Sequence, residues 1–191
     1  MVASMEELAK DKHYTYTDYV SWGDSVRYEL IDGTPYMLAA PSWKHQRISG
    51  ELYLQLATFL KGKPCRVFTA PFDVRLNAEE NDDTVVQPDL VVVCDRSKLG
   101  GTGYQGSPDM IIEILSPSSA RHDLLIKLQL YQKVGVVEYW IVDLERKVVS
   151  VHTLENGKYM INTYGDTDTI SVQVLNGCQI SLQDVFEDIE D

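Results

Sequence analysis

The sequence predicts a mixed α/β fold, in which helices pack against a mixed β-sheet. Short apolar runs at 85–93, 110–115 and 138–143 are typical of strands that are buried on both faces. Two other segments, 42–61 and 120–134, carry apolar residues at helical spacing instead. The succession of strand 110–115, helix 120–134 and strand 138–143 indicates a β-α-β crossover, which makes its two strands parallel neighbours.

The first elements are a short helix and a hairpin. Residues 15–24 are expected to form a helix capped by Thr17. Segments 27–31 and 35–38 flank Asp32-Gly33, a strong hairpin turn signal. A long amphipathic helix should follow, capped by Ser42 and ended by Gly62-Lys63-Pro64. Its apolar stripe consists of Ile48, Leu52, Leu56, Phe59 and Leu60.

The central and C-terminal parts read mostly as strands. Segments 66–69 and 72–76 are predicted strands around Pro71, and 85–93 is a third strand that Pro88 makes irregular. We expect a flexible loop at 100–106, a turn at 116–118 and a helix at 120–134 that Gly135 ends. Further strands are predicted at 147–154, 158–164 and 169–174, with a hairpin turn at Asn156-Gly157.

Length and composition predict one globular domain over residues 1–191. No apolar run approaches the roughly 20 residues that span a bilayer, so no membrane partner is expected. The N-terminal segment carries acids and lysines where a signal peptide would be apolar, which predicts a cytoplasmic location. Cys65, Cys94 and Cys178 are far apart and odd in number, so we expect them to be reduced.

The net charge of −12 argues against tight non-specific binding of nucleic acid, because phosphate contacts dominate that affinity. Four acids cluster at 79–83 and five lie in an acidic C-terminal tail, 183–191. Without these nine acids the net charge of −12 would be −3. A local basic face is then possible, from Lys44, Arg47, Lys61, Lys63 and Arg66.

Two carboxylates lie in apolar strands, where an unpaired charge is costly. Asp89 lies within VVQPDLVVV, and Glu113 lies within DMIIEIL. Each needs a metal, a partner or several hydrogen bonds if it is buried. Pro88 cannot donate to a sheet ladder, which would leave room beside Asp89 for a coordinating group. The alternative for either acid alone is a carboxylate hydrogen-bonded at a strand end.

Lys127 is the third candidate. It lies three residues after Leu124 and four before Tyr131, so it flanks the apolar stripe of its helix. It can therefore reach the two acids from the helix. The alternative is a surface pair with Asp123, which would contribute only a few tenths of a kcal/mol.

These motifs resemble a known family. The segments YELIDG, VQPDLVVV, IIEILSPSSARHD and KLQLYQKVGVVEYWIVD, between about 28 and 151, are similar to the Uma-type family of predicted endonucleases. That family belongs to the PD-(D/E)XK superfamily, so the resemblance implies a restriction-endonuclease-like core over 28–151, with an N-terminal hairpin and extra C-terminal strands.

The resemblance also implies site residues. Pro88-Asp89 matches the PD of the motif and Glu113 matches its second acid. The motif lysine would stand at position 115, where this chain has Leu115, and Lys127 matches the helix lysine that replaces it in this family. The resemblance also points to Glu29 and His45 as site neighbours.

The implied activity is Mg²⁺- or Mn²⁺-dependent hydrolysis of double-stranded DNA. Phosphodiester cleavage needs a hydroxide-like nucleophile and charge stabilisation, which metal ions held by oxygen ligands supply. Asp89 and Glu113 would bind the metal with a main-chain carbonyl near Ile114, and Lys127 would act on the attacking water. Glu29 would add a second-metal ligand unless it lies on a solvated hairpin, and His45 would orient a phosphate or water unless it is only a polar residue of a helix N-terminus.

Two other functions remain open. One is a DNA-associated or regulatory binding protein that keeps the nuclease fold without turnover. The other is a hydrolase, such as a glycosidase, that uses the two carboxylates as acid and base, and this predicts an aromatic-lined cleft without metal. A two-fold homodimer would suit duplex cleavage.

Overall fold

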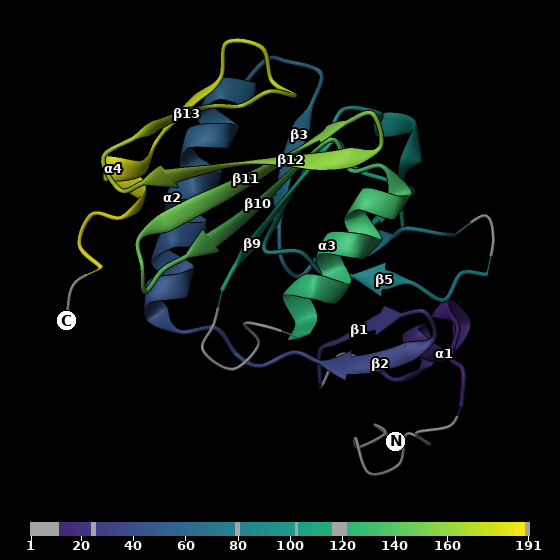
Figure 1. Ribbon diagram of the computed structural model, residues 1–191. Helices are drawn as coiled ribbons and strands as arrows, with labels where there is room; N and C mark the ends of the chain where they lie inside the picture. Colours follow the sequence, from purple (N-terminus) through teal and green to yellow (C-terminus); the bar gives the residue numbers. More distant parts are fainter. Residues whose placement is uncertain (1–11, 24–25, 79–80, 102, 116–121, 190–191) are drawn as a thin grey trace. The chain divides into compact units, whose positions relative to one another are not determined.

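The computed structural model describes residues 12–23, 26–78, 81–101, 103–115 and 122–189, with no account of the side chains of residues 121–124. The chain divides into two compact units (Figure 1). The first unit comprises Met1–Ala40, Phe72–Gln87 and Lys98–Gly106, and the second comprises Pro41–Pro71, Pro88–Ser97 and Ser107–Asp191. We describe each unit by itself, and the expectation of a single domain stays a prediction.

The first unit is a six-stranded sheet with one short helix, α1 (Tyr16–Ser21). Its strands follow the order β2 (Thr34–Met37), β1 (Tyr28–Ile31), β5 (Val85–Val86), β4 (Asp73–Arg75), β8 (Gly103–Gln105) and β7 (Leu99–Gly100). The cap of α1 is Thr15 and not Thr17, because the backbone N–H and the hydroxyl of Thr15 both donate to Asp18 Oδ2. The predicted hairpin is confirmed, since β1 pairs antiparallel with β2 around Asp32-Gly33.

Segment 100–106, which we expected to be a flexible loop, contributes two strands of this sheet, so that prediction is wrong. β7 pairs with β8, and β8 runs parallel to β4. A Cβ at Gly103 would collide with the carbonyl oxygen of Asp73. The glycine there therefore permits close approach of two strands, and is not a mark of flexibility.

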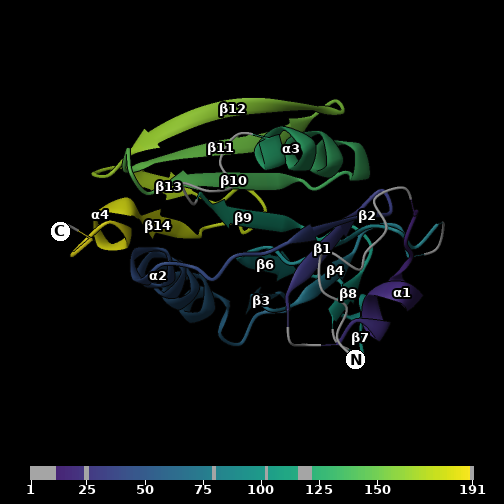
Figure 2. The same ribbon diagram turned by 90° about the horizontal axis from the view of Figure 1, so that it is seen from below.

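The second unit is built on a six-stranded mixed sheet, which Figure 2 shows from one end. The strand order is β12 (Lys158–Gly165), β11 (Val148–Glu155), β10 (Glu138–Asp143), β9 (Met110–Ile114), β6 (Leu90–Val93) and β3 (Arg66–Thr69). Only β9 and β10 run parallel, as the predicted β-α-β crossover requires. The helix of the crossover is α3 (His122–Val134), and the predicted turn at 116–118 and the first residues of the predicted helix lie outside the described residues.

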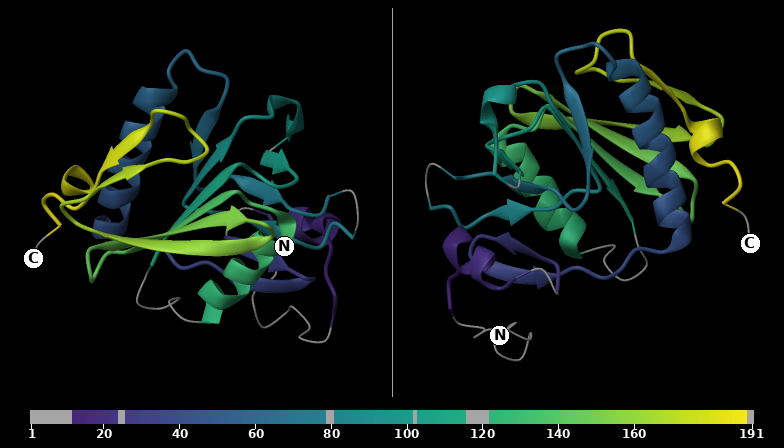
Figure 3. Two further views of the ribbon diagram at one scale, coloured as in Figure 1. Left: turned by 45° about the horizontal axis from the view of Figure 1, so that its top comes forward. Right: turned by 180° about the vertical axis from the view of Figure 1, so that it is seen from behind.

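Two helices cover opposite faces of this sheet (Figure 3). The long helix α2 (Trp43–Leu60) begins after Ser42, whose hydroxyl accepts from the backbone N–H of His45, as the sequence predicts. Its buried stripe packs with Leu90, Ile112 and Ile114, which point to one face of the sheet. Side chains alternate along a strand, so Val91, Ile111 and Glu113 point to the face that carries α3.

The predicted single strand 85–93 is wrong. The chain forms β5 in the first unit, leaves it after Val86, and enters β6 in the second unit at Leu90. Pro88 has no N–H to continue a ladder, which accounts for the break. Asp89 therefore stands immediately before β6, at the start of that strand.

The expectation of three reduced cysteines is also wrong. Cys65 and Cys94 form a disulfide, while Cys178 is free and buried. β3 pairs antiparallel with β6 so that Arg66 lies opposite Val93. The next step of that register brings Cys65 and Cys94 together, with their Cα atoms 4.0 Å apart. The bond thus follows from strand pairing.

Within the predicted acidic tail 183–191, the described residues 183–189 contribute apolar side chains to the core. β13 (Thr169–Ser171) pairs with β14 (Gln179–Ser181), and the short helix α4 (Leu182–Val185) follows directly. Leu182, Val185, Phe186 and Ile189 are buried in the same cluster as the apolar face of α2. The remaining short element, the 3₁₀ helix η1 (Arg96–Lys98), follows β6. No helix in the described part of the chain has the length and apolarity needed to cross a bilayer.

Candidate active site

The site lies in the second unit, where β6 begins and β9 ends. β6 and β9 are antiparallel, with Leu90 opposite Ile112. Asp89 immediately precedes β6, and Glu113 lies near the end of β9. Because Leu90 is the first paired residue of β6, both acids that the sequence singled out lie at the same end of this strand pair.

Asp89 is held from two directions. Its Oδ2 accepts a hydrogen bond of 2.7 Å from the backbone N–H of Ile114 and one of 3.1 Å from His45 Nε2. Its own carbonyl accepts from the N–H of Ala70. The side chain is 20% exposed. Asp89 is thus fixed in orientation but still reachable from solvent, as a ligand of a bound ion must be.

His45 reaches Asp89 from the first turn of α2. The helix begins at Trp43, so His45 lies on the buried face one turn below the Ser42 cap, and only 7% of it is exposed. Burial lowers the pKa of His45, but its hydrogen bond to Asp89 and the charges of Asp89 and Glu113 outweigh burial and raise that pKa above its usual value. This favours the imidazolium form, with Nε2 donating to the carboxylate.

Glu113 is bound by two side chains of α3. Its Oε1 accepts from Lys127 Nζ at 2.9 Å and from the Tyr131 hydroxyl at 2.9 Å. The side chains of Lys127 and Glu113 are only 10% and 11% exposed, so this is a buried ion pair. Lys127 therefore points at Glu113, and the alternative in which it is a surface lysine is wrong.

Tyr131 is the member of this cluster that sequence reasoning missed. It served only as a marker of the buried side of α3, and it is fully buried against Tyr139. Its spacing from Lys127 in the sequence could have indicated it. Tyr131 follows Lys127 by four residues and so lies on the same helix face, where its hydroxyl needs a partner. Asp123, the other expected neighbour of Lys127, has a side chain outside the described residues.

Glu29 lies in the first unit, on β1, and is 2% exposed. It is therefore not a residue of a solvated hairpin. Its Oε1 accepts from the backbone N–H of Gln87 at 2.8 Å. The side-chain amide of Gln87 in turn donates to Asp73 Oδ1 and to the Tyr19 hydroxyl. Glu29 thus helps to fix Gln87, two residues before Asp89 in the sequence.

The oxygen-bearing side chains of the second unit meet some of the requirements of a site for a hard divalent cation such as Mg²⁺. Within the described ranges, no group of three or more His, Cys, Asp or Glu side chains could hold a metal ion. Mg²⁺, however, usually keeps several waters and binds through one or two carboxylates. Asp89 and Glu113 are carboxylates of that kind, and their binding of a metal stays a prediction.

Comparison with known proteins places this chain in a family. The sequence profile of the family described as "Uma2: Putative restriction endonuclease" matches residues 16–183. The chain belongs to the Uma2 family. The matched range includes every residue of the site described above, as well as Glu29.

Two relatives of the Uma2 chain illustrate how far the similarity extends. An uncharacterized protein, slr1290, from Synechocystis sp. (strain ATCC 27184 / PCC 6803 / Kazusa) is 24% identical over 160 residues, which cover 82% of this chain and 83% of that protein. A crystal structure from Anabaena variabilis ATCC 29413, described as "a putative nuclease belonging to DUF820", matches with a TM-score of 0.74 at 20% identity. It covers 90% of this chain and 97% of that one. The predicted restriction-endonuclease-like α/β fold is confirmed.

Proposed function

We propose that this Uma2 protein is a metal-dependent endonuclease that hydrolyses phosphodiester bonds of DNA at Asp89, Glu113 and Lys127. The observation that carries the proposal is the buried Glu113–Lys127 ion pair, on the strand next to the one that Asp89 precedes. Two central strands and the helix that crosses over them supply these groups. Family membership supports the nuclease class, and the motif Pro88-Asp89 with Glu113 supports the assignment of residues.

The metal would be Mg²⁺ or Mn²⁺, held by Asp89 and Glu113. When bound, it would supply a more acidic water molecule and positive charge beside the scissile phosphate. The carboxylate of Asp89 is oriented before any metal binds, because the N–H of Ile114 and the ring of His45 fix its Oδ2. The carboxylate thus needs little reorganisation to accept an ion.

Lys127 and His45 would act on the substrate. The Lys127 ammonium lies 2.9 Å from Glu113, where it can hold the attacking water and counter the charge that develops on the phosphate. His45 is a proposed contact for a phosphate or water on the family resemblance alone, because its Nε2 is hydrogen-bonded to Asp89 and its Nδ1 is buried. Tyr131 would keep Glu113 in place through its hydroxyl. Glu29 is a proposed contributor of a second metal ligand, on the resemblance of its YELIDG segment alone.

The test is cleavage of supercoiled plasmid with Mg²⁺ or Mn²⁺. Wild type should convert it to nicked or linear DNA, and Glu113→Gln should not. Glu155→Gln is the matched control, because Glu155 is an exposed acid of β11 in the same unit. Cleavage by Glu113→Gln at the wild-type rate would overturn the assignment.

The second candidate function is a DNA-associated or regulatory binding protein without turnover. Leu115 favours it, since the usual motif lysine is missing, and so does the net charge of −12. This alternative predicts that wild type and Glu113→Gln leave the plasmid equally intact. A two-fold dimer that acts on both strands of a duplex stays a prediction under either function.

A further inference from the structure

The basic residues of this acidic chain are concentrated in one segment. Residues 43–66 hold five basic side chains and one acid, a net charge of +4 with His45 neutral, whereas the whole chain carries −12. The one acid, Glu51, is 3.3 Å from Arg47 and also accepts from Gln55. The segment comprises α2 and the turn that leads into β3. This segment is therefore the most basic stretch that the groove below can draw on for an anionic partner.

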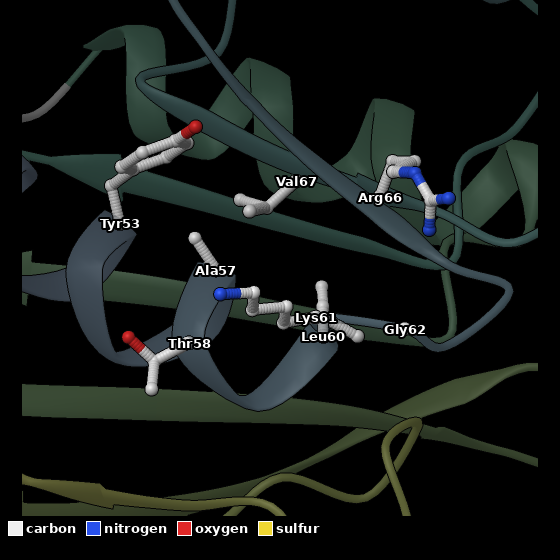
Figure 4. A pocket seen from close by; sticks show the side chains of 8 residues that line it. All are labelled: Tyr53, Ala57, Thr58, Leu60, Lys61, Gly62, Arg66 and Val67. Carbon is white, nitrogen blue, oxygen red and sulfur yellow. The ribbon is translucent and has the colours of Figure 1, made fainter.

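A groove of about 470 Å³ lies at the C-terminal end of this segment, within the second unit (Figure 4). Its volume is within the range of small-molecule sites, about 300–1,000 Å³. No acidic side chain lines it. The lining includes Tyr53, Ala57, Thr58, Lys61, Arg66 and Val67. The groove thus combines an apolar floor with two cations.

The Arg66 cation is held in place before any ligand arrives. One guanidinium nitrogen of Arg66 donates to the carbonyl of Cys65 at 2.8 Å and also to the carbonyl of Lys63. The side chain of Lys61 extends back along the helix toward Ala57 (Figure 4). A fixed guanidinium loses little conformational freedom when it binds a phosphate.

Tyr53 supplies an aromatic wall. It is 41% exposed although it is a large side chain of a packed helix. Its ring stands beside Ala57 and Val67, so the small side chain of Ala57 leaves space next to it (Figure 4). Exposed aromatic rings beside cations are the elements with which proteins bind single-stranded nucleic acid, since every base can stack on a ring.

We propose that this groove binds one unpaired nucleotide of a nucleic-acid strand, with its base on Tyr53, its phosphate on Lys61 and a neighbouring phosphate of the strand on Arg66. A base inside a duplex is stacked on both faces and cannot lie on Tyr53. The preferred ligand is therefore single-stranded, or a duplex with an unpaired end. The choice of nucleic acid over another polyanion rests on the proposed nuclease function.

The groove is separate from the candidate active site. Lys61 follows His45 by 16 residues along α2, which is about 24 Å of helix at 1.5 Å per residue. A strand held in the groove would need several nucleotides to reach Asp89. The groove would thus select strands with an unpaired end and leave cleavage to the residues already described.

The test is fluorescence anisotropy with a labelled oligothymidylate in EDTA, where no cleavage occurs. Tyr53→Ala should weaken binding about 5- to 150-fold, because stacking contributes about 1–3 kcal/mol per base. Tyr53→Phe keeps the ring and should bind as wild type does. Lys61→Gln should weaken binding and reduce the slope of log K against log salt by about 0.7. Lys158→Gln is the matched control, because Lys158 is an exposed lysine of β12 in the same unit, and it should change nothing.

Equal binding by wild type and Tyr53→Ala would overturn the proposal. So would a blunt duplex that binds as tightly as the single strand, or a poly-glutamate peptide that competes as well as unlabelled oligothymidylate. The second result would indicate general phosphate binding, and the third would indicate an acidic protein partner. Glu113→Gln separates this proposal from the nuclease function, since it should lose plasmid cleavage and keep Tyr53-dependent binding.

Discussion

Glu113 shows how a buried charge is tolerated in this protein. A carboxylate on a central strand is costly unless it is paired, and Lys127 and Tyr131 both donate to its Oε1. The two donors come from successive turns of α3, so the ion pair also ties the helix to β9. The same contacts that would position a catalytic carboxylate therefore contribute to folding.

Lys127→Met should destabilise the protein markedly. Removing one partner of a buried ion pair leaves the other charge uncompensated, which typically costs about 3–5 kcal/mol. Urea unfolding without metal should show a loss of that order. Lys133→Met, an exposed lysine of the same helix, should change the free energy of unfolding by less than about 0.5 kcal/mol. Equal stability of the two variants would show that the Glu113–Lys127 contact has little energetic weight.

His152 is a second buried polar residue, with a different consequence. It is 4% exposed, and its ring nitrogens have no hydrogen-bond partner among the residues that the structure describes. Its neighbours are the rings of Tyr139 on β10 and Tyr159 on β12. Burial lowers the pKa of His152, so the folded protein keeps it neutral.

Stability should therefore fall as the pH falls through about 6.5, the ordinary pKa of histidine. Below that pH the unfolded chain takes up a proton at His152 that the folded chain resists, so unfolding is favoured. Between about pH 7.5 and about pH 5.5 wild type should lose about 1 kcal/mol more than His152→Phe. Urea unfolding at both pH values measures the difference, and parallel losses in the two proteins would contradict this account.

At the scale of elements, the disulfide joins the edge strand β3 to β6, the strand that Asp89 precedes. The bond closes a loop with a sequence separation of 29 residues. A disulfide that closes a loop of this size lowers the entropy of the unfolded chain, and this raises the free energy of unfolding by about 2–4 kcal/mol. It therefore stabilises the strand pair on which the Asp89 end of the site is built.

Reduction should lower the free energy of unfolding by about 2–4 kcal/mol. Guanidinium unfolding with and without dithiothreitol measures it. The double variant Cys65→Ser/Cys94→Ser should be equally unstable in both buffers, since Cys178 has no second thiol within the chain to pair with. A wild-type curve that does not respond to reductant would mean that the bond carries no stability.

The elements also show where sequence patterns suffice. The bounds of α2 follow from the Ser42 cap and a regular apolar stripe, because both are local signals. The break between β5 and β6 could not be predicted from the sequence. An apolar run looks the same whether its residues join one sheet or are divided between two sheets. The disulfide depends on the pairing of β3 with β6, and pairing between distant strands leaves no local trace.

For the molecule as a whole, the sequence singled out three candidate residues whose role in a site stays a prediction. Asp89 and Glu113 stand out because charge is rare in apolar strands, and Lys127 because it flanks a buried stripe. Tyr131 was missed because its ring fits the core and only its hydroxyl serves the site. The contribution of the C-terminal segment to the core was also missed. Its many acidic residues suggested an exposed segment, although Val185, Phe186 and Ile189 are buried.

Metal binding should stabilise the whole protein. A ligand that binds only the folded state at about 100 times its Kd adds about 2.7 kcal/mol, which corresponds to a rise in Tm of about 5–10 °C for a chain of this size. Differential scanning fluorimetry with millimolar Mg²⁺ or Mn²⁺ should show it. Asp89→Asn should remove the rise, whereas Glu155→Gln should keep it. An unchanged Tm for wild type would count against a metal site.

The most direct test of the central claim is single-turnover cleavage of a labelled DNA substrate. It compares wild type with Lys127→Met and with Lys133→Met, all folded and saturated with Mn²⁺. Lys127→Met should cleave about 10²–10³-fold more slowly, which is the typical loss for one charge-stabilising donor, while Lys133→Met should match wild type. Equal rates for all three proteins would contradict the assignment of Lys127 as the lysine of the active site.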